Sequence, residues 1–141
     1  MIETDIIIIG AGPVGLFTVF EAGLLKLRCH LIDSLGEPGG QCSEIYPKKP
    51  IYDIPGFPSI LAGELIDNLM KQAEPFSPGF TLGESAMSID EVEDNKLSIS
   101  SLCKFSMMYT CSKLVISLNN CTFTVYKFCL VSNSKSFTIP I

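Results

Sequence analysis

A glycine-rich segment near the N-terminus has the residue types and spacing of a phosphate-binding turn. Residues 10–15 read GAGPVG, which matches G-x-G-x-x-G, and they directly follow the β-branched run Asp5–Ile9. In this pattern the first glycine permits a tight turn, the second lets backbone approach a pyrophosphate, and the third lets a helix pack closely on the strand. The helix N-terminus attracts anions through its N–H groups and its dipole. The candidate cofactor-binding residues are Gly10, Gly12, Pro13 and Gly15.

An acidic residue stands where a dinucleotide-binding turn needs one. The apolar segment 29–32 is typical of a second strand and ends at Asp33, 18 residues after Gly15. That is close to the offset of about 20 residues expected for a ribose-binding acid. Its carboxylate can accept hydrogen bonds from both ribose hydroxyls of an adenosine, and it would repel a 2′-phosphate. The turn therefore suits FAD or NAD better than NADP, while the alternative is a glycine turn that only packs a helix on a sheet.

A third group of candidates lies in the segment 38–46. Gly39 and Gly40 would let backbone pass close to a flat ring, and the amide of Gln41 can both donate to and accept from the ring edge. Tyr46 can stack or hydrogen-bond nearby. Gly40, Gln41 and Tyr46 are therefore candidates for the second half of a dinucleotide site.

These residues need a parallel sheet and covering helices to position them. The continuous apolar run 5–9 favours a strand buried on both faces, and residues 16–22 continue as a helix. The segment 59–73 has helical apolar spacing, which predicts a second amphipathic helix. Its predicted core stripe is Leu61, Leu65, Ile66, Leu69, Met70 and Ala73. Short strands are predicted at 80–82 and 86–92, and the lone histidine, His30, is interpreted as core or rim filler.

Residues 5 to about 96 resemble the start of the thioredoxin-reductase-like flavoproteins, and most of all the bacterial ferredoxin–NADP(+) reductases of that type. The segments that carry the resemblance are 32–35 (IDSL), 38–41 (PGGQ), 46–49 (YPKK) and 51–58 (IYDIPGFP). The resemblance implies an α/β fold, namely an incomplete Rossmann-like FAD-binding domain with a parallel sheet, flanking helices and a small β hairpin. In site terms it implies that Gly10, Gly12 and Gly15 hold the pyrophosphate, Asp33 the adenosine ribose, Gln41 and Tyr46 the flavin side, and Ala86 the adenine end through backbone.

The resemblance also implies an activity and partners. Family members carry FAD on this domain and bind NADPH as co-substrate on a second domain, and electrons pass between NADPH and a ferredoxin or flavodoxin-like carrier. No side-chain acid, base or nucleophile is needed, so no catalytic residue is predicted, and the family implies a homodimer. Two alternatives stay open: a thioredoxin-reductase-like pyridine nucleotide-disulfide flavoprotein, and a non-enzymatic nucleotide-binding remnant.

The chain changes character after about residue 96. The segment 97–141 has no Asp or Glu, although it holds nine serines, four lysines and four of the six cysteines. We therefore divide the chain into a partial FAD-binding domain, 1–96, and a tail, 97–141, whose composition is typical of out-of-frame or degenerate sequence. Within the tail, 114–118 and 122–126 are predicted strands with Asn119-Asn120 as a turn. No second glycine fingerprint occurs, so the NADPH domain is expected to be absent and activity to be low or lost.

Composition excludes several other classes. The 141 residues carry a net charge of −5, which argues against nucleic acid as a partner. The longest uncharged run of the first part, 6–20, is shorter than the roughly 20 residues of a spanning helix, and the start MIETD is not a basic leader. We therefore expect a soluble, cytoplasmic protein without membrane contact. No two cysteines form C-x-x-C, so neither a redox dithiol nor a metal site is predicted.

Overall fold

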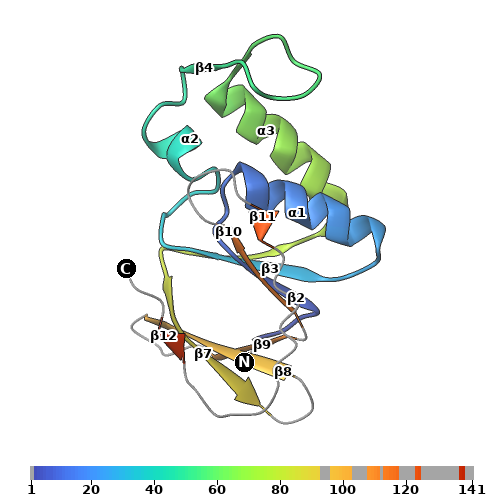
Figure 1. Cartoon of the computed structure of the whole chain (residues 1–141), viewed down its shortest axis with the longest axis vertical. Helices are drawn as coiled ribbons and strands as arrows, with labels where there is room; N and C mark the ends of the chain where they lie inside the picture. The colour runs from blue at the N-terminus through green and yellow to red at the C-terminus, as the bar shows by residue number, and fades with distance from the viewer. Residues whose placement is uncertain are drawn as a thin grey trace.

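The computed structural model describes residues 2–92, 96–102, 108–111, 113–117, 123–124 and 137–138. These residues form three layers, with helices on one side, a parallel sheet in the middle and an antiparallel sheet on the other side (Figure 1). The predicted α/β class, with a parallel sheet, flanking helices and a β hairpin, is confirmed.

The middle layer is built from four parallel strands in the order β10-β2-β3-β6. β2 (Ile6–Ile9) and β3 (Cys29–Asp33) pair in register, with Ile6 opposite Cys29 and Ile9 opposite Ile32. β6 (Gly79–Leu82) lies on the outer side of β3, and β10 (Lys113–Ser117) lies beside β2. The order of strands along the chain thus reverses at β2. In open parallel sheets of this kind, ligands bind outside the carboxyl ends of the strands at that point.

The helical layer consists of α1 (Pro13–Leu24) and α3 (Ala62–Ala73), followed by the 3-10 turn η1 (Glu74–Phe76). Both helices pack on the same face of the parallel sheet and against each other. The main core lies between these layers. Its fully buried members include Ile8, Leu16, Val19 and Leu31.

The predicted helix 59–73 begins later than expected. Ile60 and Leu61 form β5 (Ile60–Leu61), which pairs antiparallel with β4 (Pro50–Ile51), and α3 starts at Ala62. Leu61 was predicted in the core stripe, but 45% of its surface is exposed because it lies in this short ribbon. The other predicted apolar positions of the helix are buried or pack against the main core, so most of the stripe is confirmed.

The second sheet is antiparallel except for β1, which runs parallel to β9, and it covers the other face of the parallel sheet. Its order is β1-β9-β8-β7-β12, and its centre is the hairpin of β7 (Ser85–Val92) and β8 (Lys96–Leu102). A second core of Ile7, Ile32 and Ile99 joins the two sheets. The remaining strands of this layer are β1 (Ile2–Glu3), β9 (Met108–Cys111) and β12 (Phe137–Thr138).

Part of the tail takes part in both sheets. The predicted strand 114–118 corresponds to β10, and the predicted strand 122–126 corresponds to β11 (Phe123–Thr124), which pairs antiparallel with β10. Asn119 and Asn120 lie outside the described residues. β10 itself runs parallel to β2, with Leu114 opposite Ile7. The tail therefore supplies two described strands, β10 and β11, of the sheet that carries the glycine turn.

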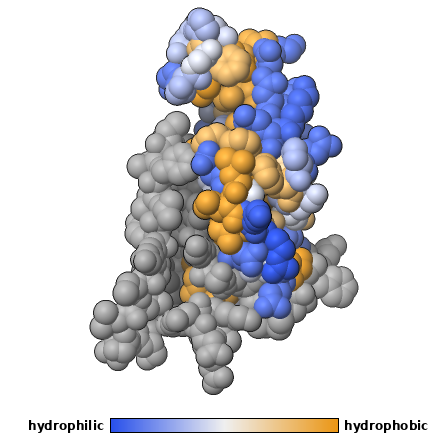
Figure 2. All heavy atoms as spheres, turned by 90° about the vertical axis from the view of Figure 1, so that its right-hand side faces the viewer, coloured by the Kyte–Doolittle hydropathy of each residue, from blue (hydrophilic) through white to orange (hydrophobic). Residues whose placement is uncertain are grey.

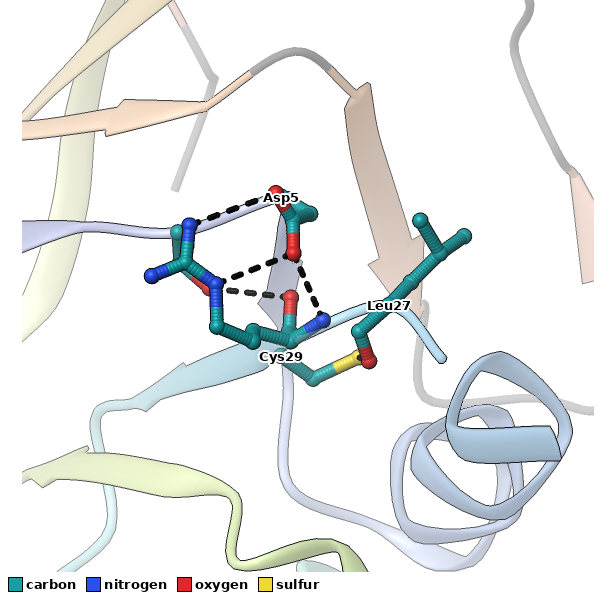
Figure 3. A network of polar contacts seen from close by, with 5 residues as sticks. Asp5, Leu27 and Cys29 are labelled. Atoms are coloured by element: carbon teal, nitrogen blue, oxygen red, sulfur yellow. Dashed lines mark hydrogen bonds and ion pairs between the residues drawn. The ribbon is translucent and has the colours of Figure 1, made fainter. Parts of the chain in front are cut away.

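A polar clamp holds the starts of β2 and β3 together (Figure 3). The backbone N–H and Nε of Arg28 both donate to Oδ2 of Asp5, at 2.8 and 3.1 Å. Thr4 Oγ1 donates to the Arg28 carbonyl at 2.9 Å. The side-chain hydrogen bond from Arg28 lowers the pKa of the partly exposed Asp5 carboxyl. This clamp fixes the register of the two strands whose opposite ends carry the candidate site.

Candidate dinucleotide-binding site

The glycine turn joins β2 to α1 at the carboxyl edge of the parallel sheet. Gly10 has φ +104°, a conformation that favours glycine, and its N–H donates to the Ile32 carbonyl at 2.8 Å. Gly12 is the N-cap of α1 and Pro13 is its first residue. No side chain caps this helix, so its first-turn N–H groups point out of the helix end without an intrahelical acceptor. Such an end suits a phosphate.

Two glycines of the turn have opposite surroundings. A Cβ built on Gly15 would lie 2.0 Å from the Gly10 carbonyl oxygen, so helix and turn are packed backbone to backbone there. A Cβ built on Gly12 would meet no described atom within 4 Å. Gly15 is therefore needed for the fold, whereas Gly12 leaves room for a bound group to approach the backbone.

Asp33 stands at the end of β3, next to the turn. Its Oδ2 accepts from the Ala11 N–H at 2.6 Å and its Oδ1 accepts from the Leu35 N–H at 2.9 Å. The structure thus brings Asp33 to the glycine turn, as the spacing predicted. It also shows that both carboxylate oxygens already accept backbone N–H groups, which the sequence did not predict.

The second glycine loop packs against the first. The Gly39 N–H donates to the Ala11 carbonyl at 2.8 Å, and a Cβ built on Gly40 would lie 3.4 Å from the Gly12 Cα. Gly39 and Gly40 have φ values of +115° and +59°, which side-chain-bearing residues rarely adopt. The loop can therefore pass close to Gly12 only with glycine at these positions.

Gln41 and Tyr46 form a pair at this loop. Gln41 begins the short helix α2 (Gln41–Glu44), and the Tyr46 hydroxyl donates to its Oε1 at 3.1 Å. The Lys49 ammonium lies 5.1 Å from the centroid of the Tyr46 ring, within cation–π range. The hydrogen bond leaves the Gln41 NH2 group to donate elsewhere, as an edge contact to a flat ring would require.

Ala86 lies near the start of β7, the strand whose start is joined to the end of β3. The Glu84 N–H donates to the Asp33 carbonyl at 3.0 Å, which ties the start of β7 to the end of β3. The Ala86 side chain packs against the second core, so only its backbone could face a ligand. Ser101, on β8, donates from its hydroxyl to Glu84 Oε2 at 2.6 Å and supports this corner.

The predicted residues therefore meet in one place. Gly10 to Gly15, Asp33, Gly40 and Gln41 converge at the carboxyl ends of β2 and β3. Tyr46 is joined to this group by its bond to Gln41, and Ala86 lies on β7, whose start is tied to Asp33 through Glu84. Sequence reasoning missed Ala11 and Leu35, because they act through backbone groups and a residue type carries no signal for that. It also missed Glu84 and Ser101, a pair that only the hairpin pairing brings together.

The other polar groups of the described part offer less chemistry. Burial raises the pKa of the Cys29 thiol to about 11, so it stays protonated and inert. Among the described residues, no three His, Cys, Asp or Glu side chains are grouped as metal ligands. An open cleft between α3, η1 and β6 contains no predicted site residue; Asp67, Met70, Lys71, Glu74 and Phe80 are among its lining residues. None of the described helices is long and apolar enough to cross a bilayer.

Comparison of sequences relates this site to known proteins. The ferredoxin–NADP reductase 1 of Christiangramia forsetii is 74% identical over 99 residues, which are 70% of this chain and 28% of that protein. The ferredoxin–NADP reductase of Flavobacterium johnsoniae is 65% identical over 101 residues, 72% of this chain and 29% of that protein. The N-terminal part of this chain is related to ferredoxin–NADP reductases. The predicted resemblance is confirmed, although no family model matches the chain.

Ferredoxin–NADP reductases of this kind are much longer than the present chain, which spans under a third of the curated relatives it matches. The fold is also that of known structures. Thioredoxin reductase from T. acidophilum superposes with a TM-score of 0.69 at 22% identity, covering 82% of this chain and 35% of that one. Thioredoxin reductase from Streptococcus pyogenes superposes with a TM-score of 0.66 at 24% identity, covering 81% of this chain and 34% of that one. The fold is therefore that of thioredoxin-reductase-like proteins.

Proposed function

We propose that this chain is the FAD-binding part of a ferredoxin–NADP(+) reductase and binds FAD at the site formed by the two glycine loops. One observation carries the proposal: Gly12 and Gly40 meet at the helix N-terminus with open space over Gly12. Identities of 65 to 74% with named reductases support the family's own cofactor over NAD.

Each part of the site has a task in this proposal. The first-turn N–H groups of α1 receive the pyrophosphate, and Gly12 lets it come close. Asp33 faces the adenosine ribose, and the backbone of Ala86 faces the adenine. The Gln41–Tyr46 pair orients the isoalloxazine edge. Bound FAD supplies hydride and single-electron transfer, while the chain supplies binding and orientation.

We further propose that turnover between NADPH and ferredoxin is low or absent in this chain alone. Hydride transfer needs a nicotinamide held against the isoalloxazine, and the chain shows one glycine fingerprint, the one used for FAD. Relatives named ferredoxin–NADP reductase support a ferredoxin or flavodoxin-like carrier as redox partner. We extend the family's homodimer and a cytoplasmic location to this chain on the same basis.

A second function is favoured by the exposed apolar surface. Leu24 and Leu25, at the end of α1, are 59% and 73% exposed, and the face on that side shows apolar surface bordered by polar surface (Figure 2). A nucleotide-binding subunit that associates with another polypeptide would cover such surface. A thioredoxin-reductase-like flavoprotein would share the fold, but the C-x-x-C motif of a redox dithiol does not occur in this sequence, which weighs against that alternative.

One experiment tests both FAD binding and turnover. The purified chain is loaded with FAD, passed through a desalting column and examined by visible spectroscopy before and after anaerobic addition of NADPH. A retained flavin spectrum that NADPH does not bleach supports the proposal as stated. Prompt bleaching contradicts low turnover, and complete loss of flavin on the column contradicts FAD binding.

We propose that the family-related part ends near residue 96 and that the tail has a separate origin. The support is its composition: no acidic residue and four of the six cysteines in 45 residues. The nucleotide sequence tests this. A second glycine fingerprint in another reading frame downstream establishes a frameshift, and closely related genes with this same tail in frame contradict it.

A further inference from the structure

The Asp33 carboxylate connects two separate backbone segments. Oδ2 accepts from Ala11 in the middle of the glycine turn, and Oδ1 accepts from Leu35 in the loop that follows β3. The bond to Ala11 is short at 2.6 Å, and the bond to Leu35 has the ordinary N–H···O length of 2.9 Å. The side chain is therefore used as a brace between the two loops that border the site.

Ala11 is held from both sides by such contacts. Its N–H donates to Asp33, and its carbonyl accepts from the Gly39 N–H at 2.8 Å. Its neighbours, Gly10 and Gly12, are both glycines with wide conformational freedom. The bond to Asp33 thus restrains the turn directly before the first residue of α1, in addition to the bonds from the Gly10 N–H to Ile32 and from the Gly39 N–H to Ala11.

We infer that Asp33 is a positioning residue for the phosphate-binding turn. By holding the Ala11 N–H, its carboxylate fixes residues 10–15 in the shape that presents the first-turn N–H groups of α1 to a diphosphate. This role rests on the proposed dinucleotide site and deepens it. It differs from a contact with the ribose, because it acts on any diphosphate ligand whether or not the ligand carries ribose hydroxyls.

The variant Asp33→Asn removes half of the brace while keeping its shape. An amide has one acceptor oxygen and one NH2 donor, so it can serve only one of the two backbone N–H groups. Glu37→Gln is the matched control, because Glu37 is exposed in the same loop and the change removes the same charge. Isothermal titration of each protein with ADP and with 2′,3′-dideoxy-ADP measures the effect.

In Asp33→Asn, we expect the affinity for 2′,3′-dideoxy-ADP to fall about tenfold, which corresponds to one hydrogen bond to a charged group. The affinity for ADP should fall at least as much, because the proposed ribose contact is weakened as well. Glu37→Gln should leave both affinities unchanged. A loss confined to ADP would assign Asp33 to the ribose alone and overturn the inference. The inference is also overturned if Asp33→Asn binds both ligands as tightly as the wild type does, or more tightly. The main effect of the substitution would then be to remove the repulsion between the carboxylate and the anionic ligand.

A second measurement needs no ligand and separates this inference from the proposed function. Amide hydrogen exchange at Ala11 and Leu35 should be at least about tenfold faster in Asp33→Asn for whichever N–H loses its acceptor. Exchange in the middle of β2 should not change. If the exchange rates of Ala11 and Leu35 are the same in Asp33→Asn as in the wild type, Asp33 does not hold the two loops. This outcome can be read even when no nucleotide binds to the wild-type chain and the proposed function fails.

Should Asp33→Asn not fold, hydrogen exchange of the wild-type chain decides by itself. The Ala11 and Leu35 amides are expected to exchange more slowly than the amide of Gly36, which is exposed in the same loop. Equally fast exchange of all three amides overturns the inference.

Discussion

Adding one methyl group at either of two neighbouring glycines should separate ligand binding from folding. In Gly15→Ala the new Cβ would lie 2.0 Å from the Gly10 carbonyl oxygen and 3.2 Å from its carbon. Because these are backbone atoms, the turn and the helix must move apart. Overpacking of this kind costs about 1–3 kcal/mol in the free energy of unfolding, and a backbone obstacle favours the upper end.

Gly12→Ala should behave in the opposite way. The new Cβ meets no described atom within 4 Å, and the backbone at φ −72° and ψ −175° is open to any residue. Alanine is a poorer N-cap than glycine, which lowers stability. Alanine also reduces the conformational entropy of the unfolded chain, which raises stability by about 0.4–1 kcal/mol, so the two effects offset each other. Stability should stay within about 0.5 kcal/mol of wild type, whereas FAD affinity should fall at least about 100-fold because the pyrophosphate needs that space.

Urea unfolding followed by circular dichroism gives the stabilities, and FAD fluorescence titration gives the affinities. Gly36→Ala is the control for a methyl group in open space, because Gly36 also has no described atom within 4 Å of its Cβ position. It should match the wild type in both assays. The reasoning is refuted by a Gly12→Ala chain that binds FAD normally, or by a Gly15→Ala chain as stable as Gly12→Ala.

Three further predictions concern single side chains. Lys26→Gly should raise the free energy of unfolding in urea by about 0.5–1 kcal/mol, because Lys26 has φ +59°; a loss of stability contradicts this. Cys29 should resist iodoacetamide at pH 8 until urea unfolds the chain, because burial raises its pKa to about 11; peptide mapping that finds equal labelling with and without urea disproves it. Burial lowers the pKa of His30, so the unfolded chain takes up a proton that the folded chain resists. Stability should therefore fall as the pH drops through about 6.5, and His30→Gln should lose that dependence in urea unfolding; an unchanged dependence excludes His30 as its source.

The parts of the fold with strong local patterns could be predicted from the sequence. The isoleucine run of β2, the glycine turn and the apolar stripe of α3 each depend on periodicity or on backbone freedom, which the residue types record directly. The start of α3 could not be placed in the same way. Leu61 fits the helical spacing, but pairing with β4 draws it into a strand, and that pairing is a contact between distant residues.

The arrangement within the site was only partly predictable. The spacing of Asp33 and the Gly39-Gly40 pair pointed to one place, and the structure brings them together around Ala11. The hydrogen bonds that Asp33 accepts from two backbone N–H groups could not be predicted from the sequence, because almost any residue type can supply a backbone N–H. The position of β10 beside β2 was also not predictable. Its segment was predicted as a strand, but its pairing with β2 is a contact between residues more than 100 positions apart, which no local pattern records.

The most direct test of the site is a titration of the isotope-labelled chain with FAD, followed through its backbone amide resonances. We expect saturable shifts with one FAD per chain, largest at Gly12, Val14, Gly15, Gly40 and Gln41. Shifts centred on the cleft between α3 and β6, or no shifts at all at a stoichiometric excess of FAD, would contradict this expectation.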